Sequence, residues 1–334
     1  MVVVHKELSG EWKSLDYLGA FRVRLGIRRN QYRVEPGLYK LGNPQKESPV
    51  LVTANYKLTV DIVRRAVKGL DLWILVLDTK GINVWCAAGK GTFGTDELIN
   101  RIGQVELGEI VSHRTLILPQ LGAPGMTPVE VKRATGFSIT YGPVEAIDIP
   151  DYIKAGHKAS EKMRRKVYSP SERFNVALTH FSQGLLAVLI ISAVFVLLDI
   201  VIGYKSGFQI NKSLSANVII AISSLITGSF LANLLLPLLP GRAFSLKGLF
   251  IGIVFSGIFL FYLFNVLPDH SVLYSGGKIL FLLAFIVYQV LNLTGSSTYT
   301  SLSGVRKEMA VTIPLSLTAV VISLILIITG GFIL

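Results

Sequence analysis

The sequence predicts a Rossmann-like α/β domain followed by an all-α transmembrane domain of five helices. In the first half of the chain, apolar strands alternate with amphipathic helices, as in parallel sheets whose two faces are covered. Beyond Phe181 the composition changes to long apolar runs. The whole chain of 334 residues has a mean hydropathy of +0.55 and only 16% charged residues. Soluble domains usually carry about 25% charged residues, so the second half is predicted to lie in a membrane.

Three segments are expected along the chain. Residues 1–160 are predicted to form a cytoplasmic ligand-binding domain, residues 161–180 a basic juxtamembrane linker, and residues 181–334 the transmembrane domain. Lys6 and Glu7 stand where a signal peptide would need a longer apolar core. We therefore expect a multi-pass protein of the cytoplasmic membrane with its N-terminal domain in the cytoplasm.

The net charge of +12 includes the basic run Lys162–Lys166, just before the first long apolar run. Basic juxtamembrane segments mark the cytoplasmic side of a membrane and contact anionic lipid. No nucleic-acid-binding motif and no interleaving of aromatic with basic residues accompanies this run. The expected partner is therefore membrane lipid and not nucleic acid.

The first half contains four predicted strands: Val50–Thr53, Leu72–Leu77, Leu116–Leu118 and Phe137–Tyr141. An amphipathic helix is predicted at Leu58–Val67, opened by Thr59 and with Asp61 in its first turn. In parallel sheets of this kind the ligand lies beyond the carboxyl ends of the strands. The residues at those ends are Thr53–Asn55, Asp78–Thr79 and Pro119–Ala123.

The stretch Asn83–Thr95, NVWCAAGKGTFGT, holds the only cysteine of the chain, Cys86. It also matches the dinucleotide-binding pattern GxGxxG at GKGTFG. In dinucleotide-binding folds these glycines follow the strand directly, whereas Gly89 comes about eleven residues after Asp78. A short helix over Trp85–Ala88, ended by Gly89 and placed above the strand ends, is predicted instead.

Two interpretations of that helix stand side by side. A lone cysteine is most often a small buried hydrophobic residue, and a tryptophan is most often a packing anchor. Alternatively, alanine and glycine let a helix lie close against a flat ligand. The single cysteine also excludes an internal disulfide and a cysteine-ligated iron–sulfur cluster within this chain.

Five segments approach the roughly 20 apolar residues that span a bilayer: Phe181–Ile202, Val218–Leu239, Leu246–Leu267, Ile279–Leu293 and Ala310–Leu334. With the first domain inside, the loop holding Arg242 and Lys247 and the loop holding Arg306 and Lys307 also fall inside. Asp269 falls outside, which agrees with the positive-inside tendency. Five spans place the C-terminus outside.

Few ionisable side chains are expected inside the spans, and Asp199 is the main one. A path for protons or ions usually shows more of them, so a transporter is disfavoured. The inside loop Thr294–Met309, TGSSTYTSLSGVRKEM, is rich in Ser and Thr. We interpret it as a helix connector, with a docking or substrate-access role as the alternative.

The octapeptide NVWCAAGK at Asn83–Lys90, followed by GTFGT, resembles the cap-helix signature of the mercury-methylating corrinoid protein family (HgcA). Further matching segments follow in the same order: VTANYKLT ending at Thr59, LDTKGINVW at Leu77–Trp85, HRTLILPQLGAPG at His113–Gly125 and TGSSTYTSLSGVRKE at Thr294–Glu308. The resemblance covers essentially the whole chain. The first half is also similar to the corrinoid-binding domain of the corrinoid iron–sulfur protein, from which it departs by a cysteine in the cap helix and no cluster cysteines.

The resemblance implies that residues 1–160 bind a cobalt corrinoid whose own base is displaced, with the Cys86 thiolate as lower axial ligand and catalytic residue. A thiolate is a strong metal ligand once deprotonated. The other common cobalamin pattern, DxHxxG, is absent. The remaining candidate contacts are Thr53, Thr59, Asn83, Val84, Trp85, Ala87, Ala88, Gly89, Lys90, Gly122 and Ala123.

The implied activity is transfer of a methyl group from the corrinoid to inorganic Hg(II). Because Hg(II) is an electrophile, the methyl group must arrive with electrons, and an electron-rich thiolate opposite it favours that mode. The oxidised cobalt then needs two low-potential electrons, for which the family implies a small ferredoxin with two [4Fe–4S] clusters. A methylated folate-type compound is the expected methyl donor.

Three alternatives remain open at this point. The protein is a membrane-anchored corrinoid methyl carrier whose physiological acceptor is not mercury, an NAD-dependent membrane oxidoreductase built on GKGTFG, or a transporter or sensor with a ligand-binding domain. Bound cobalt separates the corrinoid hypotheses from the other two.

Overall fold

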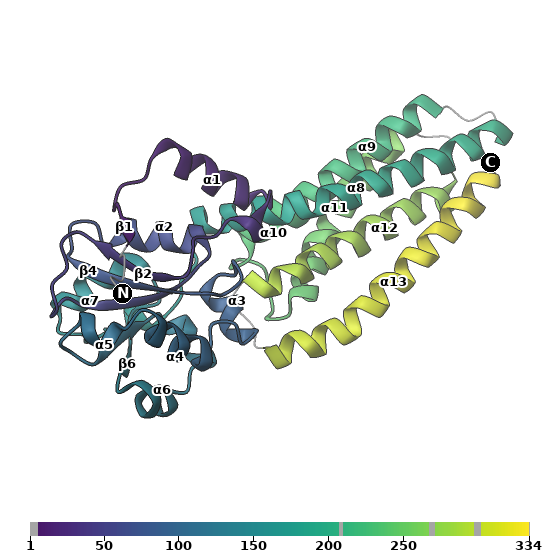
Figure 1. The fold of residues 1–334 in the computed structure, drawn as a ribbon. Helices are drawn as coiled ribbons and strands as arrows, with labels where there is room; N and C mark the ends of the chain where they lie inside the picture. Colours follow the sequence, from purple (N-terminus) through teal and green to yellow (C-terminus); the bar gives the residue numbers. More distant parts are fainter. Residues whose placement is uncertain (1–5, 207–209, 267–270, 297–301, 334) are drawn as a thin grey trace. The chain divides into compact units, whose positions relative to one another are not determined.

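The computed structural model describes residues 6–206, 210–266, 271–296 and 302–333 (Figure 1). The chain divides into two compact units. The first holds the described residues up to Val23 together with Ile27–Val167, and the second holds Arg24–Gly26 together with the described residues from Tyr168 onwards. The predicted order, an α/β domain followed by five long apolar helices, is confirmed.

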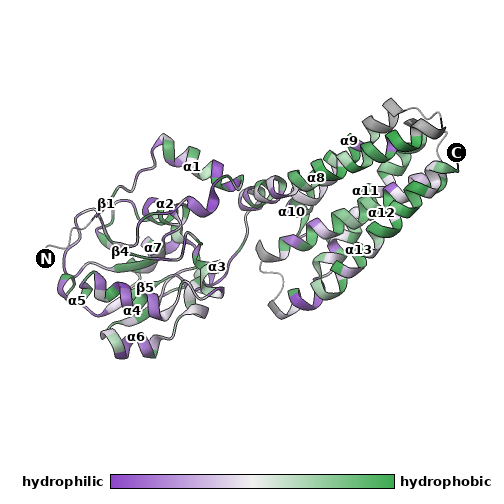
Figure 2. Ribbon diagram, turned by 45° about the vertical axis from the view of Figure 1, so that its right-hand side comes forward, coloured by the Kyte–Doolittle hydropathy of each residue, from purple (hydrophilic) through white to green (hydrophobic). Residues whose placement is uncertain are grey.

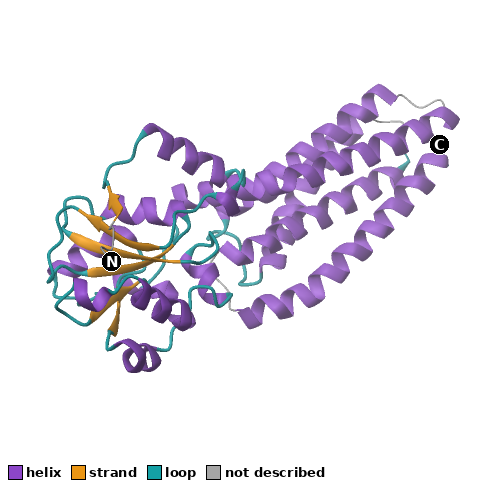
Figure 3. Ribbon diagram, viewed as in Figure 1, coloured by secondary structure: helices purple, strands orange, loops and turns teal. Residues whose placement is uncertain are grey.

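A six-stranded sheet forms the centre of the first unit (Figure 3). Its strands are β1 (Lys6–Leu8), β2 (Gly37–Leu41), β3 (Val50–Ala54), β4 (Leu72–Leu77), β5 (Thr115–Leu118) and β6 (Ser138–Tyr141). The spatial order is β1-β2-β4-β3-β5-β6. The four predicted strands run parallel, but β2 pairs antiparallel with β4, so the sheet is mixed rather than wholly parallel.

Strand β3 lies between β4 and β5, and its register pairs Thr53 with Val76 and Leu51 with Ile117. The chain passes from β3 to β4 on one side and later crosses back to β5 on the other. This reversal opens a crevice between the carboxyl ends of β3 and β5, where ligands of doubly wound sheets bind. Every residue of β3 and β4 is buried, as their unbroken apolar runs predict.

Helices cover both faces of the sheet. They are α1 (Ser14–Arg24), α2 (Lys57–Ala66), α3 (Val84–Gly89), α4 (Thr95–Gln104), α5 (Leu107–Ile110), α6 (Pro128–Thr135) and α7 (Ile149–Lys154), with short 3₁₀ turns η1 (Arg29–Gln31), η2 (Gln120–Gly125), η3 (Ala146–Asp148) and η4 (Lys162–Arg164). The prediction that Thr59 opens the second helix is wrong. Helix α2 starts at Lys57 after Tyr56, which provides no side-chain cap, and Thr59 lies within the helix. For the same reason Asp61, predicted in the first turn, lies beyond it.

The second unit is helical (Figure 2). Its elements are α8 (Pro170–Ser206), α9 (Ile210–Ile226), the π-helical turn η5 (Thr227–Leu231), α10 (Ala232–Leu235), α11 (Phe244–Val266), α12 (Val272–Leu291), η6 (Asn292–Ser296) and α13 (Leu302–Phe332). Helix α8 thus begins inside the segment predicted as a linker. Five described stretches are long and apolar enough to cross a membrane: Pro170–Ile202, Ala216–Leu235, Phe244–Asn265, Val272–Thr294 and Ser303–Phe332.

Two predicted boundaries in this unit need correction. The fourth span starts at Val272 rather than Ile279, because two glycines and Lys278 lower the hydropathy of a segment that is nevertheless helical. The second half of the predicted loop Thr294–Met309 is the start of α13. Residues 297–301 of that loop, and the predicted positions Leu267, Asp269 and Leu334, lie outside the described residues.

Candidate functional site

A hydrogen-bond network centred on Asn55 shapes the loop that follows β4. The Asn55 Oδ1 atom accepts hydrogen bonds from the backbone N–H groups of Thr79 and Gly81, at 3.1 and 2.9 Å, and from the Thr79 hydroxyl at 3.0 Å. Its amide nitrogen donates to Asp78 Oδ1 at 3.1 Å. Because Asn55 directly follows β3, the network ties the ends of β3 and β4 together and sets the direction in which the chain enters α3.

Asp78 is the charged member of this network. Partial burial pushes the pKa of Asp78 up, but hydrogen bonds from Lys80 and Asn55 outweigh burial and hold that pKa below its usual value. Its backbone N–H donates to Glu97 Oε1 at 2.8 Å, and Glu97 also accepts from Arg101. The loop is therefore held from α4 as well as from β3.

Helix α3 presents Cys86 on its exposed face. Asn83 caps the helix, since its side-chain Oδ1 accepts a hydrogen bond from the Cys86 backbone N–H at 3.0 Å. Cys86, Gly89 and Lys90 are exposed. The interpretation of Cys86 as a buried small hydrophobic residue is thereby wrong.

The opposite face of α3 faces the domain core. Val84, Ala87 and Ala88 are buried and belong to the hydrophobic cluster on that side of the sheet. Their side chains pack into the core, so they cannot contact a ligand on the exposed face of the helix. Of the predicted cap residues, only the exposed Cys86 and Lys90 and the half-buried Asn83 and Trp85 have side chains at the surface, where Gly89 exposes its backbone.

Phe93, in the segment after α3, packs against the turn η2. Phe93 is fully buried. A Cβ atom on Gly122 would lie 2.5 Å from the Phe93 ring, and one on Gly125 would lie 2.1 Å from the Phe93 carbonyl oxygen. These two glycines are required because Phe93 occupies their side-chain space. Gly122 itself is buried behind the helix, and Ala123 is half-buried.

The GKGTFG match has the same structural explanation. Helix α3 ends within it, Gly91 adopts a positive φ of 77°, and Gly94 precedes the first residue of α4. The N–H groups of Thr92 and Phe93 turn back to the Ala87 carbonyl. The glycines terminate one helix and begin the next, and they do not form the strand-to-helix turn of a dinucleotide site.

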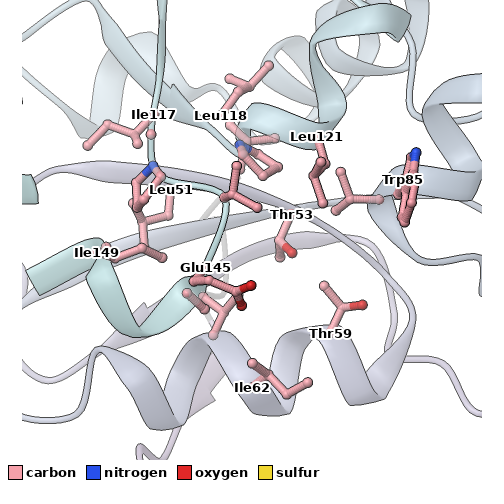
Figure 4. Close-up of a pocket in the computed structure, with 18 of the residues that line it drawn as sticks. Leu51, Thr53, Thr59, Ile62, Trp85, Ile117, Leu118, Leu121, Glu145 and Ile149 are labelled. Carbon is pink, nitrogen blue, oxygen red and sulfur yellow. The ribbon is translucent and has the colours of Figure 1, made fainter. Parts of the chain in front are cut away.

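A pocket of about 240 Å³ lies beside α3, in the crevice between β3 and β5 (Figure 4). Its walls are mainly apolar, with residues from β3, α2, β5 and the segment after β6. The labelled lining residues are Leu51, Thr53, Thr59, Ile62, Trp85, Ile117, Leu118, Leu121, Glu145 and Ile149. Cys86 does not line this pocket, although its neighbour Trp85 does.

Two polar groups in the pocket matter for binding. The Thr53 hydroxyl is buried and has no hydrogen-bond partner among the described residues. Such a group is costly unless a ligand satisfies it. The Glu145 carboxylate is held by Lys166 Nζ. Sequence analysis did not identify Glu145, though Gly142-Pro143 directly after β6 marks a further strand end.

Predicted contacts thus fall into three groups. Thr53, Thr59, Asn83, Val84 and Trp85 line the pocket. Cys86, Gly89 and Lys90 form the exposed face of α3. Ala87, Ala88 and Gly122 are buried behind the exposed face of α3, and Ala123 is half-buried. Asn55 and Phe93, which were not among the predicted contacts, hold α3 in place. Asn55 was recognisable as an amide directly after a buried strand.

Residues 26–153 match the family model of the CO dehydrogenase/acetyl-CoA synthase delta subunit, a corrinoid protein family. The N-terminal part is also similar to the acetyl-CoA decarbonylase/synthase complex subunit gamma of three archaea. Identity to the Methanopyrus kandleri protein is 33% over 128 residues, 38% of this chain and 27% of the relative. For Methanocaldococcus jannaschii it is 33% over 128 residues, 38% and 26% respectively. For Methanosarcina acetivorans it is 32% over 130 residues, 38% and 27%.

The chain spans about a quarter of the length of these curated relatives. The matched region runs from before β2 to α7, and it includes α3 and the whole pocket lining. It ends before α8. The similarity therefore concerns the sheet domain and its crevice, and it does not extend to the five apolar helices.

Proposed function

We propose that this protein is a membrane-anchored, corrinoid-dependent methyltransferase that passes a methyl group to inorganic Hg(II), on the premise that residues 26–153 are similar to a corrinoid-binding domain. One structural observation supports a role for Cys86 at the cofactor. The only cysteine of the chain is exposed on a short helix beside the crevice at the strand ends. The motif resemblance of NVWCAAGK supports the choice of mercury as acceptor.

The residues present fit a corrinoid in two respects. The crevice pocket has a volume of about 240 Å³ and is mostly apolar, which would suit the aromatic base displaced from the cofactor. The buried Thr53 hydroxyl has no partner among the residues that the structure describes, and a hydrogen-bonding group entering that pocket would satisfy it. The exposed face of α3 carries no bulky side chain at Gly89, where a Cβ would meet no atom within 4 Å. A planar ring can therefore approach the helix closely.

A bound corrinoid supplies a cobalt atom that carries a transferable methyl group. Cys86 would be the residue of this chain that holds the cobalt, through its sulfur atom. The Asn83 side chain accepts a hydrogen bond from the Cys86 backbone N–H, and the buried Ala87 and Phe93 side chains fix the position of the helix against the core. A thiolate would donate electron density to the cobalt, and this would favour transfer of the methyl group together with its bonding electrons, as the electrophile Hg(II) requires.

Partners complete the proposal. Transfer of a methyl group with both bonding electrons would leave the corrinoid two electrons more oxidised than the state that accepts a methyl cation. This chain has one cysteine and hence no cluster to provide them. A small ferredoxin with two [4Fe–4S] clusters supplies the electrons, and a methylated folate-type compound supplies the methyl cation.

The test is cobalt content, visible absorption and methylmercury formation by the full chain purified without oxygen. Cys86→Ala is compared with Gly103→Ala, an exposed site where an added Cβ meets nothing within 4 Å. We expect about one cobalt per chain in the wild type and in Gly103→Ala. Cys86→Ala should show a changed spectrum and no methylmercury. Absence of cobalt after corrinoid reconstitution would refute the corrinoid proposal.

The relatives favour one second candidate, a corrinoid methyl carrier whose acceptor is not mercury. Those proteins are subunits of an acetyl-CoA decarbonylase/synthase complex by name. Stoichiometric cobalt with a Cys86-dependent spectrum but no methylmercury would select this candidate. The NAD-dependent oxidoreductase has no comparable support, since GKGTFG terminates a helix.

A further inference from the structure

A groove of about 430 Å³ lies at the N-terminal ends of α11 and α13, within the second unit. Arg242 and Ser245 contribute from the α11 side, and Lys307, Val311 and Thr312 contribute from α13. Both helices pack along α12. We call this site the α11–α13 groove.

The rim of the groove is basic. Arg242 and Lys307 are exposed, and neither forms an ion pair within the described part of the chain. The groove also contains one carboxylate, Glu308. That carboxylate accepts a hydrogen bond from the Ser245 backbone N–H and so is engaged in capping the first turn of α11. Because the groove has two cations, Arg242 and Lys307, and only one carboxylate, its rim carries a net positive charge.

Val311 lines the groove, and exposed apolar side chains continue beyond it along both helices. On α13, Val311 is 61% exposed and Leu315, one turn further along the same face, is 64% exposed. On α11, Leu246 and Phe250 are 56% and 50% exposed in the first two turns. Figure 2 shows the same change along α13, from hydrophilic residues at its N-terminal end to hydrophobic residues further on.

We propose that the α11–α13 groove binds one anionic phospholipid. Arg242 and Lys307 hold the phosphate and the anionic headgroup, the Ser245 and Thr312 hydroxyls lie beside them, and the acyl chains run along the exposed leucine, valine and phenylalanine side chains. Basic residues at the membrane surface attract anionic lipid, and a free phosphate ion gains nothing from the apolar walls. The alternation of helix direction places both N-terminal ends on one side of the membrane.

The experiment is native mass spectrometry of the full chain in detergent, titrated with phosphatidylglycerol and, separately, with phosphatidylcholine. The double variant Arg242→Gln/Lys307→Gln is compared with Arg306→Gln. Arg306 is an exposed cation on the same turn of α13 that does not line the groove. Each basic residue contributes roughly a fivefold change in binding. We therefore expect about 25-fold weaker phosphatidylglycerol binding in the double variant and less than twofold in Arg306→Gln.

A steric variant separates the groove from its charges. Val311→Trp keeps both cations and fills the apolar wall, and it should also lose the bound lipid. Equal losses in the double variant and Arg306→Gln would show diffuse attraction and overturn the proposal. Displacement of the lipid by millimolar inorganic phosphate would reassign the groove to a soluble anion. Equal binding of phosphatidylcholine, or unchanged binding in Val311→Trp, would also contradict it.

Discussion

At the scale of single residues, Asn83 matters because it holds the backbone of the only cysteine. Replacing Asn83 with Ala removes the helix cap and the hydrogen bond to the Cys86 N–H. Loss of such a cap costs about 1 kcal/mol, which in a six-residue helix should open α3 several times more often. The rate of Cys86 with a thiol reagent and the hydrogen exchange of Val84–Gly89 report this directly. Asn83→Asp keeps the oxygen acceptor and should behave like the wild type.

Thr53 makes a second prediction at this scale. Its hydroxyl is buried without a partner among the described residues. Thr53→Val replaces that group with a methyl of the same shape, so the corrinoid-free protein should become more stable by about 1 kcal/mol. If the hydroxyl binds the cofactor, corrinoid retention should fall at the same time. Thr115→Val, at a half-buried strand position that does not line the pocket, is the matched control for thermal melting and cobalt content. Unchanged retention in Thr53→Val would remove Thr53 from the cofactor contacts.

The sequence predicted the position of Cys86 on a helix but not its exposure. Alanine, glycine and cysteine are all common in cores, so composition cannot show which face of a two-turn helix is inward. The answer depends on Phe93, which lies outside the helix and fixes its orientation against η2. That contact joins parts of the chain about thirty residues apart, and one sequence does not reveal it.

At the scale of elements, α3 is a helix too short to be stable by itself, and packing against η2 must hold it. Gly122→Ala places a Cβ 2.5 Å from the Phe93 ring and should destabilise the domain by about 1–3 kcal/mol. Gly89→Ala makes the same chemical change at the end of α3, where the new Cβ meets nothing within 4 Å, and should be tolerated. Thermal melting and Cys86 thiol reactivity distinguish the two. Equal effects would mean that η2 does not support α3.

A network of ion pairs joins helix α1 to helix α2. Asp16 contacts Lys57 at 2.6 Å and Arg64 at 2.7 Å, and Arg64 also contacts Asp61 at 2.8 Å. Burial pushes the pKa of Asp16 up, but hydrogen bonds from Lys57, the Lys13 backbone and Arg64 outweigh it, so the pKa lies well below its ordinary value. A carboxylate whose folded pKa is depressed adds stability at neutral pH, and that stability disappears as the pH falls.

The pH dependence follows from that sign. The contribution of Asp16 should be complete above the unfolded pKa of about 4 and be lost progressively below it. Asp16→Asn should lower the unfolding free energy at pH 7 by about 2 kcal/mol and should flatten the acid limb of the melting temperature against pH. Melting of the full chain in detergent from pH 7 to pH 3 measures both. If the melting temperature falls as steeply with acid in Asp16→Asn as in the wild type, other carboxylates cause the acid destabilisation.

Elements were predictable where the hydrophobic pattern was long and unbroken. Strands β3 and β4 and most of the five spans meet that condition. Strand β1 has three residues and β2 alternates little, and pairing at a sheet edge, not local pattern, makes them strands. The start of α12 was missed because Lys278 and two glycines look like a loop, whereas Gly277 is needed for close packing. A Cβ there would lie 2.8 Å from the Ser323 carbonyl oxygen of α13.

At the scale of the whole molecule, the membrane half contains more buried charge than expected. Asp199 of α8 accepts hydrogen bonds from the Tyr274 hydroxyl of α12 at 2.5 Å and the Asn217 amide of α9 at 2.6 Å. Lys278 Nζ lies 3.6 Å from the same carboxylate, and both side chains are at most 1% exposed. Residues of three spans, α8, α9 and α12, therefore meet at one ion pair. Lys247, which was expected in a loop, is also buried and donates to the carbonyls of Leu236 and Leu239.

The ion pair predicts an asymmetric response to substitution. Lys278→Met leaves the Asp199 carboxylate buried without that cation and should cost about 3–5 kcal/mol, whereas Asp199→Asn/Lys278→Met removes both charges together and should recover most of the loss. Arg306→Met, which removes an exposed cation from α13, is the matched control. Melting of the full chain in detergent supplies the double-mutant cycle. If the double variant is no more stable than Lys278→Met, the two charges are uncoupled, and packing alone must join α8, α9 and α12. If the double variant regains stability, Asp199 and Lys278 neutralise each other, and this pairing allows both to lie within membrane-spanning helices.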